Sequence, residues 1–217
     1  MVEPRVLFTT KTYHNDFGPM ANGGFSRKWQ KCDYPFAEKW ILINNVQDED
    51  KVASLFKGGL DERAIKSSEY YQQALDFFGL TIADFKGGYY YSICELIELY
   101  LAKDFDYIVH FAGDCELDAD GNWINPAIES LDGKIVTASP HCQGARMVDL
   151  DQFFSDQCYL IPVKKFRRKI YNLKEPVLPQ YPPKGGDDFE HLVARYLHKF
   201  GKYRKVLGDF TYVHHNG

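Results

Sequence analysis

The sequence has no long apolar run. Nowhere in its 217 residues do about 18 consecutive apolar residues occur, which is roughly the length of a membrane-spanning helix. The opening residues, MVEPRVLFTTKTY, also lack the apolar stretch that is typical of a secretion signal. We therefore expect no transmembrane segment and a cytoplasmic protein.

Cysteine is sparse, and no two cysteines form a Cys-x-x-Cys pair. The five cysteines are widely separated and odd in number, so their spacing does not suggest zinc or redox chemistry. We predict that all of them are reduced thiols: Cys32, Cys94, Cys115, Cys142 and Cys158.

The sequence also lacks an excess of positive charge. A formal net charge of −4 gives no long-range attraction to nucleic acid or to an anionic membrane, so we expect no nucleic-acid partner. One compact basic cluster, KKFRRK at 164–169, follows an apolar run. We interpret it as a solvated edge in preference to a phosphate contact.

The composition that is present is ordinary for a globular protein, with 45% hydrophobic and 26% charged residues. One hydrophobic core typically serves about 100–200 residues. We therefore predict a single compact domain over residues 1–217.

Strand-like and helix-like patterns alternate along the chain. This alternation predicts an α/β fold with a mainly parallel central sheet flanked by helices, in which ligands gather beyond the carboxyl ends of the strands. The expected strands cover 5–10, 39–45, 106–111, 133–139, 157–166 and a last one from 205, and the expected helices cover 61–78, 89–105 and 187–201.

The segment YIVHFAGDCELDADG, residues 107–121, places carboxylates directly after a buried strand. Asp114 comes first, at the strand end, and carboxylate oxygen is the ligand that Mg2+ and Mn2+ prefer. The more conspicuous Asp118 and Asp120 stand before Gly121, where Asp-Gly is a strong turn signal. We favour Asp114 as the metal ligand and a turn for the other two.

Two further segments carry candidate chemistry. GGDDFEH at 185–191 opens a helix with Asp187 and Asp188, of which one can cap the helix and the other could act as a general base. YVHH at 212–215 ends in His214 and His215, and a neutral imidazole is a common metal ligand.

With these residues assembled, the chain resembles the GT-A-fold glycosyltransferases, particularly the inverting family 2 members. The likeness spans nearly the whole chain, and its segments follow the family's order. They are VLFTTKTY near the start, YIVHFAGDCEL after a helix, then GDDFEHLVARYL, and finally YVHH.

The resemblance implies a metal site. In that family an Asp-x-Asp at a strand end binds the divalent cation that holds the nucleotide diphosphate. Here the motif reads Ala112-Gly113-Asp114, so Asp114 is implied as the ligand of Mn2+ or Mg2+, and Ala112 replaces the first aspartate. The family's late histidine corresponds to His214 or His215, and spacing does not choose between them.

The resemblance also implies a catalytic base and a nucleotide site. Asp188 corresponds to the base that removes the proton of the acceptor hydroxyl, and Asp187 to the neighbour that orients the acceptor. The residues implied beside the nucleotide are Thr9, Thr10, Thr12, Tyr13, Asn45 and Gly113.

The expected reaction is the metal-dependent transfer of a sugar from a nucleotide-diphosphate sugar, a UDP-sugar, to an acceptor hydroxyl with inversion. Two alternatives stay open. Because Ala112 replaces the first aspartate, the chain could be a nucleotide-sugar-binding protein with weak catalysis. A sugar nucleotidyltransferase also uses a strand-end aspartate and Mg2+, although the Gly-rich basic phosphate loop of that class is not visible after the first strand.

Overall fold

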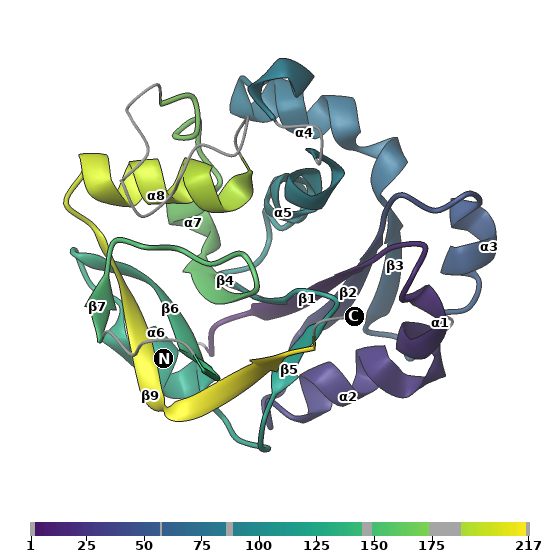
Figure 1. The fold of residues 1–217 in the computed structure, drawn as a ribbon, viewed down its shortest axis with the longest axis horizontal. Coiled ribbons are helices and arrows are strands. Elements are labelled where there is room, and N and C mark those ends of the chain that lie inside the picture. Colours follow the sequence, from purple (N-terminus) through teal and green to yellow (C-terminus); the bar gives the residue numbers. More distant parts are fainter. Residues whose placement is uncertain (1–2, 57, 86–88, 145–148, 174–187, 216–217) are drawn as a thin grey trace.

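The computed structural model describes residues 3–56, 58–85, 89–144, 149–173 and 188–215. One β-sheet runs through the molecule, with helices on both of its faces (Figure 1). The strand order is β3-β2-β1-β4-β8-β6-β9-β5, and β7 pairs with β9. The strands are β1 (Val6–Thr12), β2 (Glu38–Ile43), β3 (Glu62–Lys66), β4 (Tyr107–Phe111), β5 (Cys115–Leu117), β6 (Ile135–Cys142), β7 (Leu150–Asp151), β8 (Cys158–Pro162) and β9 (Tyr203–His214).

The predicted α/β class is confirmed, and the sheet is mixed. Strands β3, β2, β1 and β4 are parallel to one another, whereas β8 runs antiparallel to both β4 and β6. Strand β9 is parallel to β6 and antiparallel to β5 and β7. A parallel neighbour requires a long crossover, usually a helix, and the described part of the connection from β6 to β8 contains only β7.

The helices form two layers. In Figure 1, α4, α5 and α8 lie on one side of the sheet and α2 on the other. No helix among the described residues combines the length and apolarity needed to cross a membrane. The helical segments are α1 (Phe17–Pro19), η1 (Met20–Gly24), α2 (Phe25–Gln30), α3 (Glu49–Ala53), η2 (Ser67–Glu69), α4 (Tyr71–Phe78), η3 (Ile82–Asp84), α5 (Tyr89–Leu101), α6 (Ile124–Ser130), α7 (Val163–Phe166) and α8 (Phe189–Lys199).

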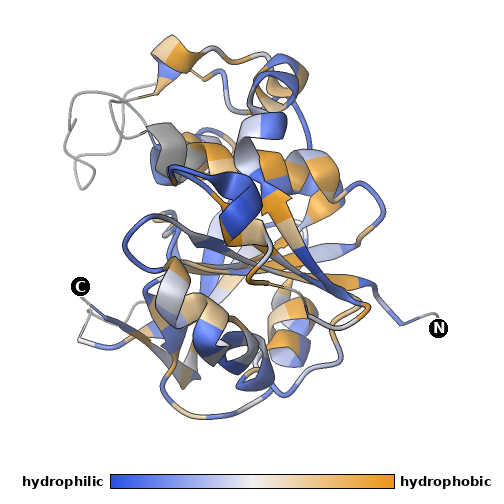
Figure 2. Ribbon diagram, turned by 90° about the vertical axis from the view of Figure 1, so that its right-hand side faces the viewer, coloured by the Kyte–Doolittle hydropathy of each residue, from blue (hydrophilic) through white to orange (hydrophobic). Residues whose placement is uncertain are grey.

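Each face of the sheet has its own hydrophobic core. Successive side chains of a strand point to opposite faces, so Leu7 of β1 packs with α4, α5 and α8, while Phe8 packs with α2 and α6. Hydrophobic and hydrophilic residues alternate along the helices, as expected where one helix face is buried (Figure 2). Both cores therefore enclose the central strands.

The helix predicted over 61–78 is wrong in its first part. Residues 62–66 form β3, in which Ala64 and Ile65 lie opposite Ile41 and Leu42 of β2. Local helix propensity is weak, and the gain from extending the sheet overrides it here. The helix begins at Tyr71 and ends as predicted at Gly79, whose left-handed φ of 70° favours glycine.

Other boundaries shift less. The strand predicted over 157–166 ends at Pro162 and continues as α7, and the helix predicted over 89–105 ends at Leu101. The helix predicted from 187 begins at Phe189, because Asp188 is its N-cap, and residue 187 lies outside the described ranges.

Candidate functional site

A cavity of about 280 Å³ lies where the carboxyl ends of β1, β2 and β4 meet the end of β9. This is the edge of an α/β sheet at which ligands are expected. Segments far apart in the sequence therefore share one cavity. It is lined by Lys11, Thr12, Tyr13, Asn44, Cys94, Ala112, Gly113, Asp114, Asp156, Gln157 and His214.

Asp114 and His214 face each other at this cavity. The Nε2 atom of His214 lies 2.8 Å from Oδ2 of Asp114, and their side chains are 30% and 47% exposed, respectively. The thiol of Cys115 completes a group in which one potential ligand atom from each residue lies within 4.8 Å of the others. Carboxylate oxygen and imidazole nitrogen, open to solvent and close together, suit a divalent cation.

Backbone pairing between β5 and β9 creates this group. Cys115 lies directly opposite His214 in the antiparallel register, and the backbone N–H of His215 donates to the carbonyl of Asp114 over 2.8 Å. The His215 side chain turns toward Glu116, at 3.4 Å. Of the two predicted histidines, His214 is therefore the one beside Asp114.

A buried lysine fixes the turn that carries Asp114. The ammonium of Lys28, on α2, donates to the carbonyl of Ala112 over 3.2 Å and also to that of Cys115. Burial lowers the pKa of Lys28, and the surrounding acidic groups, including Asp114, oppose that shift. Sequence inspection missed Lys28, because nothing in its helical segment marks it as buried.

Gly113 lies where no larger residue fits. A Cβ there would lie 2.5 Å from Oδ2 of Asp16 and 2.8 Å from the carbonyl oxygen of Lys11. Asp16 itself accepts hydrogen bonds from the Thr12 hydroxyl and from the backbone N–H of Tyr13, the latter over 2.8 Å. The loops after β1 and β4 therefore pack directly on each other.

Not all residues predicted beside the nucleotide lie at the cavity. Thr12, Tyr13 and Gly113 line it, whereas Thr9 and Thr10 are fully buried within β1 and are not among its described lining residues. The Thr9 hydroxyl lies 3.0 Å from Nδ1 of His110. These two threonines are therefore buried within β1 and do not belong to the described lining of the cavity.

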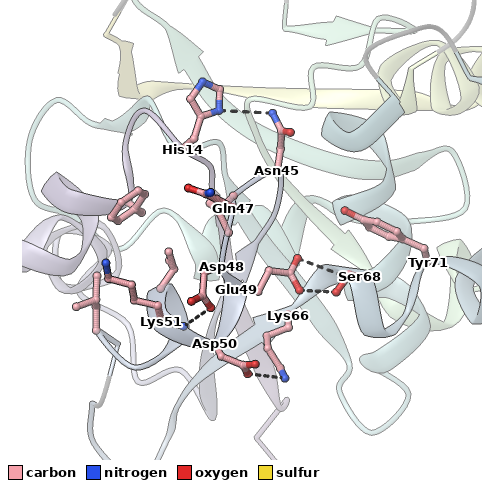
Figure 3. Close-up of a pocket in the computed structure, with 14 residues that line it drawn as sticks. His14, Asn45, Gln47, Asp48, Glu49, Asp50, Lys51, Lys66, Ser68 and Tyr71 are labelled. Carbon is pink, nitrogen blue, oxygen red and sulfur yellow. Dashed lines mark hydrogen bonds and ion pairs between the residues drawn. The ribbon is translucent and has the colours of Figure 1, made fainter.

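Asn45 lies at a second, larger cavity of about 1010 Å³, between the loops after β1 and β2 and helix α3. Its side-chain amide lies 3.5 Å from His14, and the far wall carries Glu49 bonded to Ser68 and Asp50 paired with Lys66 (Figure 3). Asn44, the preceding residue, faces the cavity that holds Asp114.

Asp118 and Asp120 lie in the exposed segment that follows β5. The backbone N–H of Asp118 donates to the carbonyl of Thr211 over 2.9 Å, and neither carboxylate belongs to the metal-ligating group found among the described residues. Both residues are therefore exposed, and their assignment to a turn stays a prediction.

Asp188 is the N-cap of α8. Its carboxylate accepts from the backbone N–H of His191 over 3.1 Å and also contacts the ring of the same residue. Burial alone would raise the pKa of Asp188, but the bonds from His191 outweigh it and hold the pKa below its ordinary value. Asp188 is therefore ionised at neutral pH. Asp187 lies outside the described residues.

Acidic groups connect the head of α8 to the cavity. Burial, together with the charges of Asp156 and Asp188, raises the pKa of Glu190 to about 9. Asp156 is itself part of the cavity lining. Glu190 therefore carries a proton at neutral pH. Sequence inspection assigned no role to either Glu190 or Asp156.

A network of charged and polar groups lies beneath the cavity. The Lys11 ammonium pairs with Glu95 of α5, a residue with no exposed surface. Burial alone would lower the pKa of Lys11, but the charges of Glu95 and Asp156 outweigh it and raise the pKa. Burial raises the pKa of Glu95 to about 7, although Lys11 and His110 favour its ionised form.

The network continues through β4 and β8. Nδ1 of His110 lies 2.9 Å from Oε2 of Glu98, and the Tyr159 hydroxyl donates to the same carboxylate over 2.5 Å. The rings of His110 and Tyr159 stack with centroids 4.9 Å apart. Two glutamates three residues apart in the otherwise apolar run ICELIEL were the sequence signal for this network.

No known sequence family matches the chain, and no curated protein is similar to it in sequence. Solved structures do share its architecture. The galactosyltransferase LgtC in complex with donor and acceptor sugar analogs has a TM-score of 0.51 at 15% identity, over 92% of this chain and 72% of that one. The chain has a GT-A fold.

Two further structures support this assignment. Glucosyl-3-phosphoglycerate synthase from Mycobacterium tuberculosis, in complex with Mn2+, UDP and phosphoglyceric acid, gives a TM-score of 0.54 at 12% identity, over 99% of this chain and 72% of that one. GalNAc-T7 with UDP, GalNAc and Mn2+ gives 0.58 at 11% identity, and the match covers 98% of this chain and 44% of that one.

We predict that breaking the Lys11–Glu95 pair strongly destabilises the protein. Lys11→Met leaves Glu95 buried without its cationic partner, which should reduce the free energy of unfolding by about 3–5 kcal/mol in urea denaturation at neutral pH. The double variant Lys11→Met/Glu95→Gln removes both charges and should recover most of the loss. A double variant that is no more stable than the single one would show that the pair does not act as a unit.

For Glu190 we predict the opposite, namely that removing its carboxyl group stabilises the folded protein at high pH. Its folded-state pKa is raised, so folding becomes progressively less favourable as pH rises from about 4.5, the ordinary value for glutamate, toward 9. Each pH unit within this range costs at most about 1.4 kcal/mol. Glu190→Gln should therefore be more stable than the wild type at pH 8 and equally stable at pH 4.

Thermal melts at both pH values measure this difference. Glu129→Gln, on the exposed surface of α6, is the matched control and should show no such pH-dependent gain. Equal stability of Glu190→Gln and the wild type at pH 8 would contradict the raised pKa.

Proposed function

We propose that this protein is a metal-dependent glycosyltransferase that transfers a sugar from a UDP-sugar to an acceptor hydroxyl with inversion. The observation that carries the proposal is the Asp114–His214 pair at the strand-end cavity. The GT-A fold supports it, because two similar structures contain UDP and Mn2+ and a third contains donor and acceptor sugar analogs.

The ligands proposed for Mn2+ or Mg2+ are Asp114 and His214. Their donor atoms fit, because a carboxylate oxygen and an imidazole nitrogen lie 2.8 Å apart on the cavity wall. When bound, the cation supplies positive charge that stabilises the departing diphosphate. The protein holds the Asp114 loop rigid with Lys28 beneath it and β9 beside it.

The donor nucleotide is proposed to lie along the ends of β1 and β2. Thr12 and Tyr13 present polar groups at the end of β1, and Asn44 does so at the end of β2. Asp16 fixes the first two by accepting from the Thr12 hydroxyl and the Tyr13 backbone. Direct contacts by Thr9, Thr10 and Asn45 are not part of the proposal, since these residues lie elsewhere.

Asp188 is proposed as the general base. An ionised carboxylate can accept the proton of the acceptor hydroxyl while that oxygen attacks the anomeric carbon and the bond to the diphosphate breaks. The transition state has oxocarbenium character, and one displacement inverts the anomeric configuration. His191 orients Asp188 through two contacts. We propose that Asp187, beside it in the sequence, helps to orient the acceptor.

The alanine at position 112 favours a second candidate function. It leaves the strand end without the first carboxylate of the Asp-x-Asp motif, so a nucleotide-sugar-binding protein with weak turnover is the competing function. Metal-dependent UDP binding without transfer to any acceptor would support it. The remaining alternative, a sugar nucleotidyltransferase, would release pyrophosphate in place of UDP.

The metal role predicts a change in nucleotide affinity. Mn2+ should raise the affinity for UDP in isothermal titration calorimetry, and Asp114→Ala should abolish this gain because the cation loses its carboxylate ligand. Asp118→Ala, in the exposed turn four residues later, is the matched control and should keep the gain. Binding of UDP that is equally tight with and without Mn2+ in the wild type would sink the metal role.

If Asp188 is the general base, its replacement should slow sugar transfer and leave UDP binding unchanged. Asp188→Asn keeps an effective N-cap, so α8 and UDP binding should survive. Transfer should fall by about 10²–10⁴-fold, because general-base catalysis is lost. Release of UDP from a UDP-sugar in the presence of an acceptor measures this.

The control for the base variant is Asp48→Asn, which makes the same change at the N-cap of α3, where Asp48 accepts from Lys51. Its transfer rate should match the wild type. An undiminished rate in Asp188→Asn would remove Asp188 from the mechanism.

A further inference from the structure

Cys115 contributes a sulfur atom to the group formed by Asp114 and His214. Its side chain is fully buried, and Sγ lies 3.6 Å from Oδ1 of Asp114. The ligand atoms of these three residues all lie within 4.8 Å of one another. One ion could therefore contact an oxygen, a nitrogen and a sulfur atom after small side-chain adjustments.

The sheet register supports this arrangement independently of side-chain conformation. Cys115 in β5 and His214 in β9 are directly opposite residues of an antiparallel pair, so their side chains project from the same face of the sheet, with Cβ atoms about 4.5–5.5 Å apart. Asp114 precedes Cys115 directly. A change of one residue in the register would move the imidazole to the other face.

The chemistry of this set differs from that of an all-oxygen cation site. Mg2+ and Mn2+ favour carboxylate, carbonyl and water oxygens, whereas a thiolate selects softer ions, above all Zn2+. A combination of cysteine, histidine and carboxylate ligands is typical of zinc, and three protein ligands leave a position open for water or substrate.

We propose that Asp114, Cys115 and His214 form a zinc site in which the Cys115 thiolate makes Zn2+ bind more tightly than Mn2+. The proposed zinc site lies at the same place as the Mn2+ site of the proposed function. It rests on that function in one respect only, namely that the two ions compete for the same ligands. A cysteine binds a metal ion as the thiolate, so the proton of the Cys115 thiol passes to solvent when the ion binds.

The spacing of the cysteines alone does not suggest a zinc site, because no two of them form a Cys-x-x-Cys pair. Asp114 directly precedes β5 and Cys115 begins it, whereas His214 ends β9, 100 positions after Asp114, and the pairing of β5 with β9 brings them together. Lys28 lies beneath the same turn, where its ammonium donates to the Cys115 carbonyl and favours negative charge nearby.

Cobalt(II) absorption spectroscopy tests the proposal, because a thiolate ligand to Co2+ produces an intense near-ultraviolet charge-transfer band. The purified 217-residue protein loaded with Co2+ should show this band, and added Zn2+ should abolish it by displacement. Cys115→Ser and Cys115→Ala should lack the band. Cys142→Ser, in β6 on the other side of β9, is the matched control and should retain it.

Metal titrations supply the second measurement. Loss of an outer-shell partner alone typically weakens metal binding by about 10–100-fold, so loss of the Cys115 ligand should weaken Zn2+ binding at least about tenfold. Mn2+ affinity should change little. Unchanged Zn2+ affinity in Cys115→Ser, or wild-type Mn2+ affinity that equals Zn2+ affinity, would overturn the proposal.

The outcome does not depend on the variants folding. If Cys115→Ser and Cys115→Ala unfold, the wild-type cobalt spectrum decides alone, because absence of the band rules out the thiolate ligand. The test is also separable from the proposed function. A thiolate band without metal-dependent UDP binding would contradict the proposed transferase and support the zinc site. Metal-dependent UDP binding without a thiolate band would support the transferase and contradict the zinc site.

Discussion

The pairing of β9 with β5 is the contact on which the candidate site depends. It holds the chain's last described residues against the loop after β4, so that His214 meets Asp114 and the His215 N–H bonds to the Asp114 carbonyl. Without this pairing the strand-end carboxylate would be one solvated group among many. With it, a carboxylate, an imidazole and a thiol converge on one cavity wall.

Buried charge stabilises the geometry from below. Lys28 bonds the carbonyls of the Asp114 turn on one side of the sheet, and Lys11 pairs with Glu95 on the other. Desolvating ammonium groups is unfavourable, so these lysines are tolerated because carbonyls and carboxylates replace the lost water. The consequence is a cavity lined by Lys11, which is paired with Glu95, and by Asp156, together with the proposed metal ligands.

The sequence was most informative where local signals suffice. The buried strand before Asp114 and the glycine that ends α4 both follow from short-range patterns, and the structure confirms them. The resemblance in the order of four segments also led to the correct fold. Each of these features depends on residues that are close together in the chain.

The features that could not be predicted depend on long-range pairing. Strand β3 is a strand because β2 offers it a partner, although its own residues favour a helix. The choice of His214 over His215 depends on the register of β9 against β5, and burial of Thr9 depends on its neighbour His110. Glu95 and Glu98 find their partners, Lys11 and His110, only when α5 packs against the sheet.

A crystal structure of the protein with UDP and Mn2+, with data collected at the manganese absorption edge, tests the central claim most directly. The account predicts an anomalous peak beside the Asp114 carboxylate and the His214 imidazole, with the diphosphate next to it in the strand-end cavity. A peak away from these two residues, or UDP seated in the larger cavity beside His14 and Asn45, would contradict it.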